Sequence, residues 1–595
     1  MWRSRSPPPA PWPRQRRPRR QGQRLALLKS ARRSPHPCSI RLPPRPDHKT
    51  TSDKIFLIGS APPSGSVTVN GQAIKRSKNG HFAPSFGLQL GENRFVLSDG
   101  RTSQTLVVTR TDPTPAVPTG LNFAPDSLVP AVDMARQVGE RVCFGAIAPP
   151  NAQVTLLLGN QKLPLTATGS SVDLPPNSAV LTGDTGPTQR SSSPYQACTS
   201  FTAAGTLQPQ YQLSLNGQTK VVNAPGKLQI LAPEAIRIAT VTATEGTART
   251  GPSTSYSRLT PLPKGTQASI TGEEGEWVRL DYGAWIRKTE VAVINAAVPP
   301  ETIIRGLSSR VNGDWTELVL PLQTPVPITI DQDTTSLTLT LHNTTAQTDT
   351  IYTSQDPVIE RLDWQQPRPG EARYTVHFKG KQQWGYKTRY DGTTLILSLK
   401  HPPKTSAARP LQGLKIFIDP GHGSENDLGA RGPTGYPEKD VALKVSKLVR
   451  DELQARGATV IMAREGDDDL WPHDRVERME AAQPDLAFSL HYNALPDAGD
   501  AEGTQGIGMF WYQPQAHGPS QFLHDYLTQK LNRPSYGVFW NNLALTRPSL
   551  APAVLVEFGF MINPEEFEWI VDEASQEQLA QTFAEGVEAW AKQAL

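Results

Sequence analysis

Residues 414–423 have the sequence Leu-Lys-Ile-Phe-Ile-Asp-Pro-Gly-His-Gly, an apolar run that ends in a polar, glycine-containing turn. Such a run, closed by proline and glycine, is typical of a buried strand. Further along, short apolar runs alternate with segments of helical periodicity. The predicted strands are 414–418, 459–462, 486–490, 507–512 and 553–558, and the predicted helices are 439–456, 474–482, 519–531 and 575–593. This alternation predicts an α/β domain over residues 411–595.

Ionisable side chains follow three of these predicted strands. His422 comes after the first strand, His491 lies just past the strand 486–490, and Glu557 lies at the end of the last strand. A fourth ionisable residue, Glu438, opens the first predicted helix. Because ligands of open α/β sheets bind at the carboxyl ends of the strands, we expect these four side chains to lie close together.

Two imidazoles and one carboxylate form a ligand set that suits Zn²⁺, with a fourth position left for water in catalytic sites. We predict that His422, Glu438 and His491 bind one zinc ion per chain. Glu557 is the predicted catalytic residue, because a hydrolytic zinc site needs a base to take the proton from water and return it to the leaving amine. Asp419 could orient His422 as a hydrogen-bond acceptor.

Other histidines and acids of the domain have simpler explanations. A lone histidine at a strand end is more often structural than a ligand, and only the combination of four matched positions argues for a site. We expect His473, His517 and His524 to be surface or locally hydrogen-bonded residues. The run 467–469, three consecutive aspartates, is expected to be a solvated loop because neighbouring side chains in a turn point in different directions.

Four motifs in this order carry a family resemblance. They are Asp-Pro-Gly-His-Gly (419–423), Glu-Lys (438–439), Ser-Leu-His-Tyr-Asn-Ala (489–494) and Val-Glu-Phe-Gly-Phe-Met-Ile-Asn-Pro-Glu-Glu (556–566). The pattern resembles the zinc-dependent N-acetylmuramoyl-L-alanine amidases. The resemblance implies the same zinc ligands and catalytic glutamate, peptidoglycan as the substrate, and cleavage of the amide between the muramic acid lactyl group and L-alanine of the stem peptide.

Details of the match qualify the resemblance. Ser424 and Tyr492 depart from the residues most common in the family, and neither belongs to the predicted metal set. Arg475 and Arg547 fit the family pattern, but helix pairing or structural ion pairs explain them equally well. Some family members cover the zinc with an extra helix that a partner removes. Prolines in 513–552 favour loops and a short strand around 543–545 over a second full helix, so we expect an open site and no protein activator.

The rest of the chain is predicted to be a series of small all-β modules. Alternating residues and turn signals such as Asn70-Gly71 indicate a β-sandwich at 53–110 and a second β module at 125–232. Cys143 and Cys198 both lie in the second module, and the sequence leaves open whether they are joined. The fold class is therefore multidomain, with β modules followed by a C-terminal α/β zinc amidase domain.

Two of these modules resemble known domains. Residues 235–294 contain Arg-Thr-Gly-Pro, Lys-Gly, Trp-Val-Arg-Leu and Gly-Ala-Trp-Ile in order and resemble bacterial SH3-like domains, which implies wall-peptide binding. An ordinary five-stranded barrel with two core tryptophans is the alternative. Residues 300–402 resemble the AMIN domains that precede many wall amidases. The whole order is similar to the cyanobacterial branch of the amidase family.

Charge is segregated along the 595 residues. Residues 1–50 hold 14 Lys and Arg against one acid, whereas the part from residue 411 onward holds 14 basic and 28 acidic residues. We interpret 1–52 as a disordered basic tail; a nucleic-acid or anionic-lipid arm is the alternative. The acidic C-terminal part excludes a uniformly basic nucleic-acid surface, so we expect no nucleic-acid partner.

The sequence also bears on location. No stretch approaches the ~18 apolar residues that span a bilayer, so we expect no membrane span. No export signal is visible in the first fifty residues. The resemblance nevertheless implies an exported protein of the periplasm or cell wall.

Three functions compete. The first is a peptidoglycan amidase. The second is a catalytically inactive peptidoglycan-binding scaffold, which would be expected to lose Glu557. The third is a zinc carboxypeptidase or another metallohydrolase with a different groove. The presence of Glu557 and the combined motifs favour the amidase.

Overall fold

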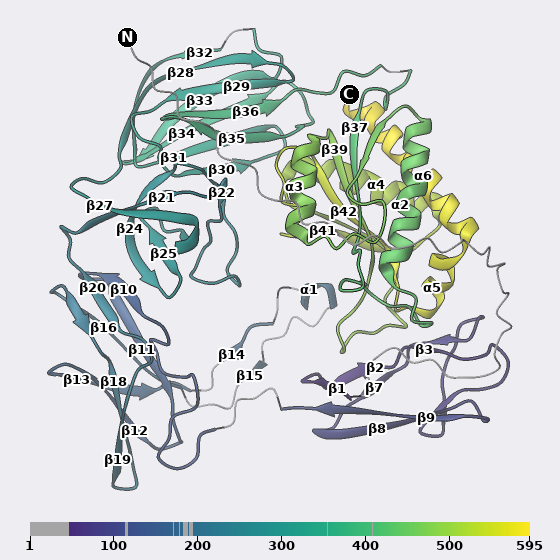
Figure 1. The fold of residues 1–595 in the computed structure, drawn as a ribbon, viewed down its shortest axis with the longest axis horizontal. Helices are drawn as coiled ribbons and strands as arrows, with labels where there is room; N and C mark the ends of the chain where they lie inside the picture. Colours follow the sequence, from purple (N-terminus) through teal and green to yellow (C-terminus); the bar gives the residue numbers. More distant parts are fainter. Residues whose placement is uncertain are drawn as a thin grey trace, which may run out of the picture. The chain divides into compact units, whose positions relative to one another are not determined.

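The structure is a computed structural model that describes residues 47–112, 117–169, 172–175, 177, 179–182, 188–189, 194–353, 355–406 and 408–595. Small β-sheets make up the described part up to residue 400, and all the longer helices follow residue 437 (Figure 1). Among the described residues, no helix is both long and apolar enough to cross a membrane. The described part is thus a mostly β structure of several sheets that ends in an α/β region.

The first module is a small β structure. Its strands are β1 (Asp47–Thr50), β2 (Lys54–Phe56), β3 (Gly59–Ser60), β4 (Thr68–Val69), β5 (Gln72–Ala73), β6 (His81–Phe82), β7 (Ser85–Gly87), β8 (Gly91–Ser98) and β9 (Ser103–Arg110). The tail predicted for 1–52 lies outside the described residues as far as residue 46. The prediction was wrong for residues 47–50, because they form β1, which pairs in parallel with β9 and so belongs to the first module.

The region predicted as the second module and the region predicted as SH3-like share one sheet. Their elements are β10 (Met134–Gln137), β11 (Arg141–Ile147), β12 (Gln153–Leu158), β13 (Gln161–Ala167), β14 (Val172–Asp173), α1 (Ala179–Thr182), β15 (Thr188–Gln189), β16 (Pro194–Ser200), β17 (Gly205–Leu207), β18 (Gln210–Leu215), β19 (Gln218–Asn223), β20 (Leu228–Leu231), β21 (Ile236–Val241), β22 (Glu245–Gly246), β23 (Leu262–Pro263), β24 (Gln267–Glu274), β25 (Trp277–Leu280), β26 (Trp285–Arg287), η1 (Lys288–Glu290) and β27 (Val291–Ala296). β10 pairs with β20 on one side and with β24 on the other, so backbone hydrogen bonds join the two units. Cys143 and Cys198 are opposite each other on β11 and β16 and form a disulfide.

Residues 302–400 form a sandwich of two antiparallel-rich sheets. The strands are β28 (Thr302–Asn312), β29 (Trp315–Pro321), β30 (Ile328–Gln332), β31 (Ser336–His342), β32 (Thr344–Tyr352), β33 (Ile359–Arg368), β34 (Glu371–Phe378), β35 (Tyr386–Asp391) and β36 (Thr394–Lys400). Their orders are β32-β28-β29-β36-β35 and β30-β31-β34-β33. Alternate inward residues, such as Leu337, Leu339 and Leu341, build the core between the sheets.

The C-terminal domain is a six-stranded sheet in the order β38-β37-β39-β42-β40-β41. Its elements are β37 (Lys415–Pro420), α2 (Glu438–Ala455), β38 (Thr459–Met462), α3 (Pro472–Ala482), β39 (Leu486–Asn493), β40 (Ile507–Trp511), η2 (Pro514–Ala516), α4 (His517–Leu531), β41 (Ser535–Trp540), β42 (Ala553–Phe560), α5 (Pro564–Val571) and α6 (Glu573–Ala594). β37, β38, β39 and β42 are parallel, and β40 runs antiparallel to β42.

Helices cover both faces of this sheet (Figure 1). α2, α4 and α6 pack on one face through a large apolar cluster that includes Val445, Leu523 and Phe583. α3 packs on the other face, where Met479 contacts Phe417 and its neighbours. Side chains alternate between the two faces along each strand, so every second residue of a strand points to α3. The polar residues at the strand ends therefore face either α3 or the opposite side, depending on their position in the strand.

One prediction about this domain was wrong, and two of its elements were not predicted. The short strand expected around 543–545 is a turn, in which Thr546 Oγ1 donates to the carbonyls of Asn541 and Leu543. The extra strand is instead β41, which pairs in parallel with β40. α5 was not predicted, although Asn563 caps it by accepting from two backbone N–H groups.

Candidate metal centre and catalytic edge

The predicted ligands converge at the carboxyl ends of β37 and β39 and at the start of α2. One ligand atom from each of His422, Glu438 and His491 can be chosen so that all lie within 4.8 Å of one another. Glu438 Oε2 lies 3.1 Å from His422 Nε2, and Glu438 Oε1 lies 3.0 Å from His491 Nδ1. Two imidazole nitrogens and a carboxylate facing one point fit the donor set and size of a zinc site.

Backbone geometry makes this close approach possible. His422 has φ of +59°, a left-handed conformation that is uncommon for a residue with a side chain. A Cβ atom on Gly421 would lie 2.5 Å from the His491 ring, and one on Gly423 would lie 2.2 Å from the Asp468 carbonyl oxygen. The glycines on each side of His422 therefore let the turn pass beneath the second histidine.

Glu438 is the most enclosed of the three ligands. Its carboxylate accepts hydrogen bonds from the backbone N–H groups of Ala430 (2.9 Å) and Tyr492 (3.1 Å). Burial alone would raise the pKa of Glu438, but its bonds to His422 and His491 outweigh burial and lower the pKa. The carboxylate is thus ionised and fixed, ready to bind a cation.

His422 has a second carboxylate partner that the sequence analysis did not identify. Its Nδ1 lies 2.5 Å from Asp427 Oδ1, which leaves Nε2 to face Glu438. Burial would lower the pKa of His422, but Glu438 and Asp427 together raise it to about 9. No sequence signal marks Asp427, because it lies in the irregular loop between β37 and α2.

Asp419 does not orient His422, so that expectation was wrong. Its carboxylate instead accepts from Arg475 Nη1 (2.5 Å) and from Ser489 Oγ (2.6 Å). The reason is strand geometry: Asp419 points to the face covered by α3, which carries Arg475. Of the two explanations left open for Arg475, the structure shows a buried ion pair.

Glu557 lies beside the cluster. It is paired in register with His491 across β39 and β42, so both side chains project from the same face of the sheet. Glu557 Oε2 is buried and has no hydrogen-bond partner among the described residues. Burial, and then the charge of Glu438, raise the pKa of Glu557 well above its usual range. A partnerless buried carboxylate next to a metal-ligand set is suited to exchange protons.

The remaining ionisable candidates lie outside the cluster. His473 pairs with Glu477, His517 packs on Trp511, and His524 bonds to Ser535. Of the three consecutive aspartates, Asp467 binds Lys439 and Asp469 binds Ser424, so they fix the loops around the site. Arg547 comes after β41 in the chain. β41 runs antiparallel to β42, so its carboxyl end lies at the other end of the strands from Glu557. Arg547 donates a hydrogen bond to the carbonyl of Asn542.

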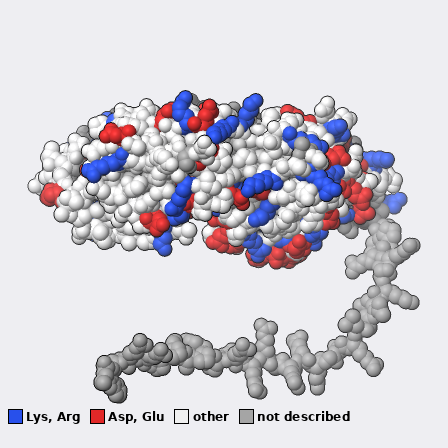
Figure 2. Space-filling view, turned by 90° about the horizontal axis from the view of Figure 1, so that it is seen from above, with Lys and Arg blue, Asp and Glu red and all other residues white. Residues whose placement is uncertain are grey.

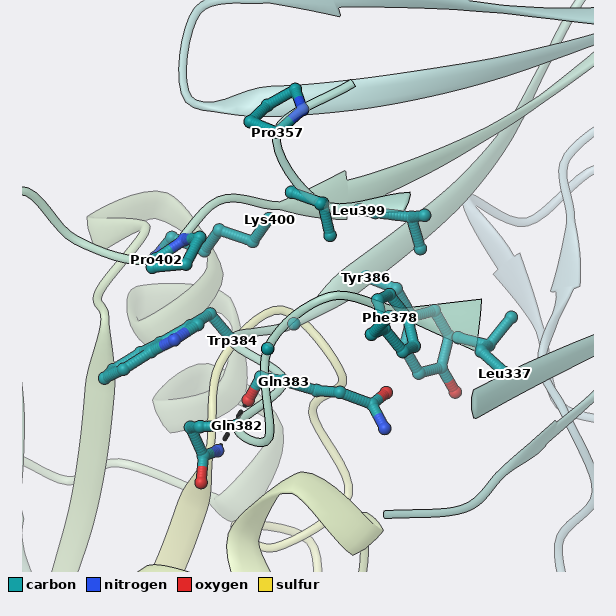
Figure 3. Close-up of a pocket in the computed structure, with 13 residues that line it drawn as sticks. Leu337, Pro357, Phe378, Gln382, Gln383, Trp384, Tyr386, Leu399, Lys400 and Pro402 are labelled. Carbon is teal, nitrogen blue, oxygen red and sulfur yellow. Dashed lines mark hydrogen bonds between the residues drawn. The ribbon is translucent and has the colours of Figure 1, made fainter. Parts of the chain in front are cut away.

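A separate hollow exists in the sandwich, near the loop between β34 and β35 (Figure 3). Its volume is about 30 Å³, and its lining comes from residues 337–402. Gln382 in this loop donates to the carbonyl of Gln383 at 2.6 Å, and buried Trp384 packs on Trp590 of α6. None of the three predicted metal ligands lines this hollow, so it is separate from the candidate metal site.

An α/β domain with a His, Glu, His cluster and a partnerless carboxylate at its strand ends has the features of a metal-dependent hydrolase. The family model for N-acetylmuramoyl-L-alanine amidase matches residues 416–589. The uncharacterized protein YqiI of Bacillus subtilis is 31% identical over 195 residues, which cover 33% of this chain and 93% of the relative. The germination-specific N-acetylmuramoyl-L-alanine amidase of the same organism is 32% identical over 195 residues, which cover 30% of this chain and 80% of the relative.

Solved structures include a similar chain, the N-acetylmuramoyl-L-alanine amidase AmiC2 of Nostoc punctiforme. It is 27% identical, covers 29% of this chain and 94% of its own, and has a TM-score of 0.28. The chain belongs to the N-acetylmuramoyl-L-alanine amidase family and is a peptidoglycan amidase, as its sequence motifs predicted.

Proposed function

We propose that the C-terminal domain hydrolyses the amide between N-acetylmuramic acid and L-alanine with one zinc ion held by His422, Glu438 and His491. In this proposal Glu557 is the catalytic general base. The observation that carries it is the arrangement of the cluster: two imidazole nitrogens face one ionised carboxylate, with a buried, partnerless carboxylate on the neighbouring strand. Zinc bound there would lower the pKa of a coordinated water and polarise the scissile carbonyl.

Glu557 has two proton-transfer roles in this mechanism. It takes a proton from the attacking water, and it then donates that proton to the amide nitrogen as the bond to L-alanine breaks. Burial and the charge of Glu438 raise the pKa of Glu557, and a raised pKa brings a carboxyl closer to the range in which it can both accept and return a proton near neutral pH. Glu438 and Asp427 meanwhile keep the rings of His422 and His491 turned toward the same point.

Digestion of purified sacculi tests the proposal. The full chain should release stem peptides with a new L-alanine amino terminus and leave an unmodified glycan, as read by mass spectrometry. A chelator should abolish this release, and added zinc should restore it. Cleavage between two residues of the peptide would support the carboxypeptidase alternative. Binding without any released peptide would support the scaffold alternative.

The β modules are proposed to hold the enzyme on its substrate. Residues 51–410 hold 32 basic and 27 acidic residues. On the face of the molecule drawn in Figure 2, Lys and Arg are interspersed with Asp and Glu. Anionic wall polymers attract such a weakly cationic region over about a Debye length, ~10 Å at 0.1 M salt. The resemblance of residues 235–294 to SH3-like domains adds wall-peptide binding. A location in the periplasm or cell wall follows from this substrate. A relative whose name places it at the cell wall supports this location: "Probable cell wall amidase LytH" of Staphylococcus epidermidis is 27% identical over 268 residues.

Sedimentation tests the binding role. A chain that ends at residue 406, first checked for native-like circular dichroism, should pellet with insoluble peptidoglycan at low salt. If this folded fragment stays in the supernatant while the full chain pellets, the amidase domain carries the binding.

We further propose that the site works without a protein activator. α4, the helix between β40 and β42, packs against α6 and against β40 and β41. Between residues 513 and 552, all of which are described, no other α-helix is present. The purified full chain should therefore digest sacculi without added protein, and inertness relieved by a cell extract would contradict this.

A further inference from the structure

A chain of buried polar groups lies beneath the candidate metal centre. His491 Nδ1 faces Glu438, so Nε2 points the other way, where it lies 3.2 Å from Ser489 Oγ. Ser489 Oγ lies 2.6 Å from Asp419 Oδ2, and Asp419 Oδ1 accepts from Arg475 Nη1 at 2.5 Å. The side chains of Asp419 and Arg475 are only 1% and 5% exposed. Water therefore cannot replace these partners at low cost.

The direction of each hydrogen bond in this chain is fixed by chemistry. Asp419, a carboxylate that pairs with Arg475, can only accept. Ser489 must therefore donate its single hydroxyl proton to Asp419, and its oxygen is left to accept from His491. Consequently the proton of the neutral His491 ring is on Nε2, and the lone pair of Nδ1 points at Glu438 and the metal position.

Arg475 extends the same chain to the first ligand. Its guanidinium also donates to the carbonyl of Pro420 (2.8 Å) and to the carbonyl of His422. His422 needs such support, because its left-handed backbone is intrinsically costly. One buried network thus connects the ring of His491 to the backbone of His422, although the two ligands come from different strands.

We propose that Ser489, Asp419 and Arg475 are positioning residues that fix the His491 tautomer and hold two zinc ligands in place. This inference rests on the proposed zinc site. Groups that orient metal ligands typically contribute 10- to 100-fold to metal affinity. The network therefore acts on zinc binding first and on turnover only through it.

Zinc affinity of the full chain tests the proposal, by competition with a chromophoric chelator. Ser489→Ala should weaken zinc binding about 10- to 100-fold, and Ser489→Thr, which keeps the hydroxyl, should restore most of the loss. Ser446→Ala is the matched control, because Ser446 is a buried serine of α2 whose hydroxyl has no hydrogen-bond partner among the described residues. It should bind zinc like the wild type.

A second measurement reads the tautomer directly. Long-range ¹H–¹⁵N NMR of the zinc-loaded wild type should show His491 protonated on Nε2, a readout that a merely structural role would not predict. Circular dichroism checks that each variant is folded. Equal zinc affinity of folded Ser489→Ala and wild type, or a proton on Nδ1, would overturn the positioning role. Failure of the wild type itself to bind zinc would instead overturn the proposed function.

Discussion

The sandwich at 302–400 and the amidase domain both bury carboxylate oxygens, but the surroundings of these carboxylates differ: one is paired with arginines, and the other has an oxygen without a partner. In the sandwich, Glu371 is 3% exposed and pairs with Arg368 and Arg373, each at 2.6 Å. Burial would raise the pKa of Glu371, and the two arginines more than offset burial, so the pKa is lowered. In the amidase domain, Glu557 Oε2 is buried without any such partner, and the pKa is raised.

This difference separates a structural carboxylate from a chemical one. A buried charge with an arginine on each side is stabilised as an ion and does not exchange protons at neutral pH. A buried carboxylate without a partner costs stability, and that cost is expected where a protein needs a group poised to transfer protons. The same residue type therefore has different consequences in the two places, and the arginine partners make the difference.

The largest expected effect is on turnover. Glu557→Gln should lower the rate of peptide release about 10²- to 10⁴-fold, because the amide cannot take the proton from water. Zinc content should stay near that of the wild type, since Glu557 is not a ligand in the proposal. Rates on sacculi and zinc content by atomic absorption measure the two quantities.

Glu371→Gln is the matched control for that variant. It removes a buried carboxylate from the sandwich, far from the candidate metal site in the sequence, and should leave the rate per folded molecule unchanged. Near-normal hydrolysis by Glu557→Gln would refute the assignment of the base and remove the contrast between the two glutamates.

The next effect is on metal binding. His422→Ala or His491→Ala should weaken zinc binding at least about 100-fold, since losing a ligand costs more than losing a group that orients one. His473→Ala, which changes an exposed histidine paired with Glu477, should bind zinc normally. Chelator competition gives the affinities. Unchanged affinity in either ligand variant would place the metal elsewhere.

A smaller effect is expected on stability. Glu371→Gln should lower the free energy of unfolding of the sandwich by about 1–2 kcal/mol, because the ion pairs with Arg368 and Arg373 are lost while the exposed Arg368 can return to water. Denaturant unfolding followed by tryptophan fluorescence measures it. A variant as stable as the wild type would show that the ion pairs only balance the cost of burial.

The smallest expected effect is the pH dependence of the stability difference between the wild type and Glu371→Gln. The folded-state pKa of Glu371 lies below its ordinary value of 4.5. Its stabilising contribution is therefore present above about pH 4.5 and is lost as the pH falls through the lowered pKa. The stability difference between wild type and Glu371→Gln should thus shrink as the pH falls below about 4.5, as thermal unfolding at each pH would show. A constant difference would assign the effect to packing instead of charge.

The sequence predicted most elements of the catalytic domain because its apolar periodicity is clear. The helix expected at 439–456 is α2, and the strand expected at 459–462 is β38. Prediction failed where local signals compete with long-range pairing. β41 contains a glycine and follows a proline, yet it forms a strand because β40 offers it a partner.

The sequence by itself determined which side chains meet at the candidate site. His422 lies just past a buried strand, and His491 and Glu557 lie near the carboxyl ends of two others. Parallel strands bring their carboxyl ends to one edge regardless of loop details. Only the tertiary structure decided what each group bonds to. Asp419 binds Arg475 and Ser489 and not His422, Asp427 reaches His422 from an irregular loop, and Glu557 has an oxygen with no partner. Hydrogen bonds depend on side-chain positions within a few tenths of an ångström, which packing sets and sequence spacing cannot.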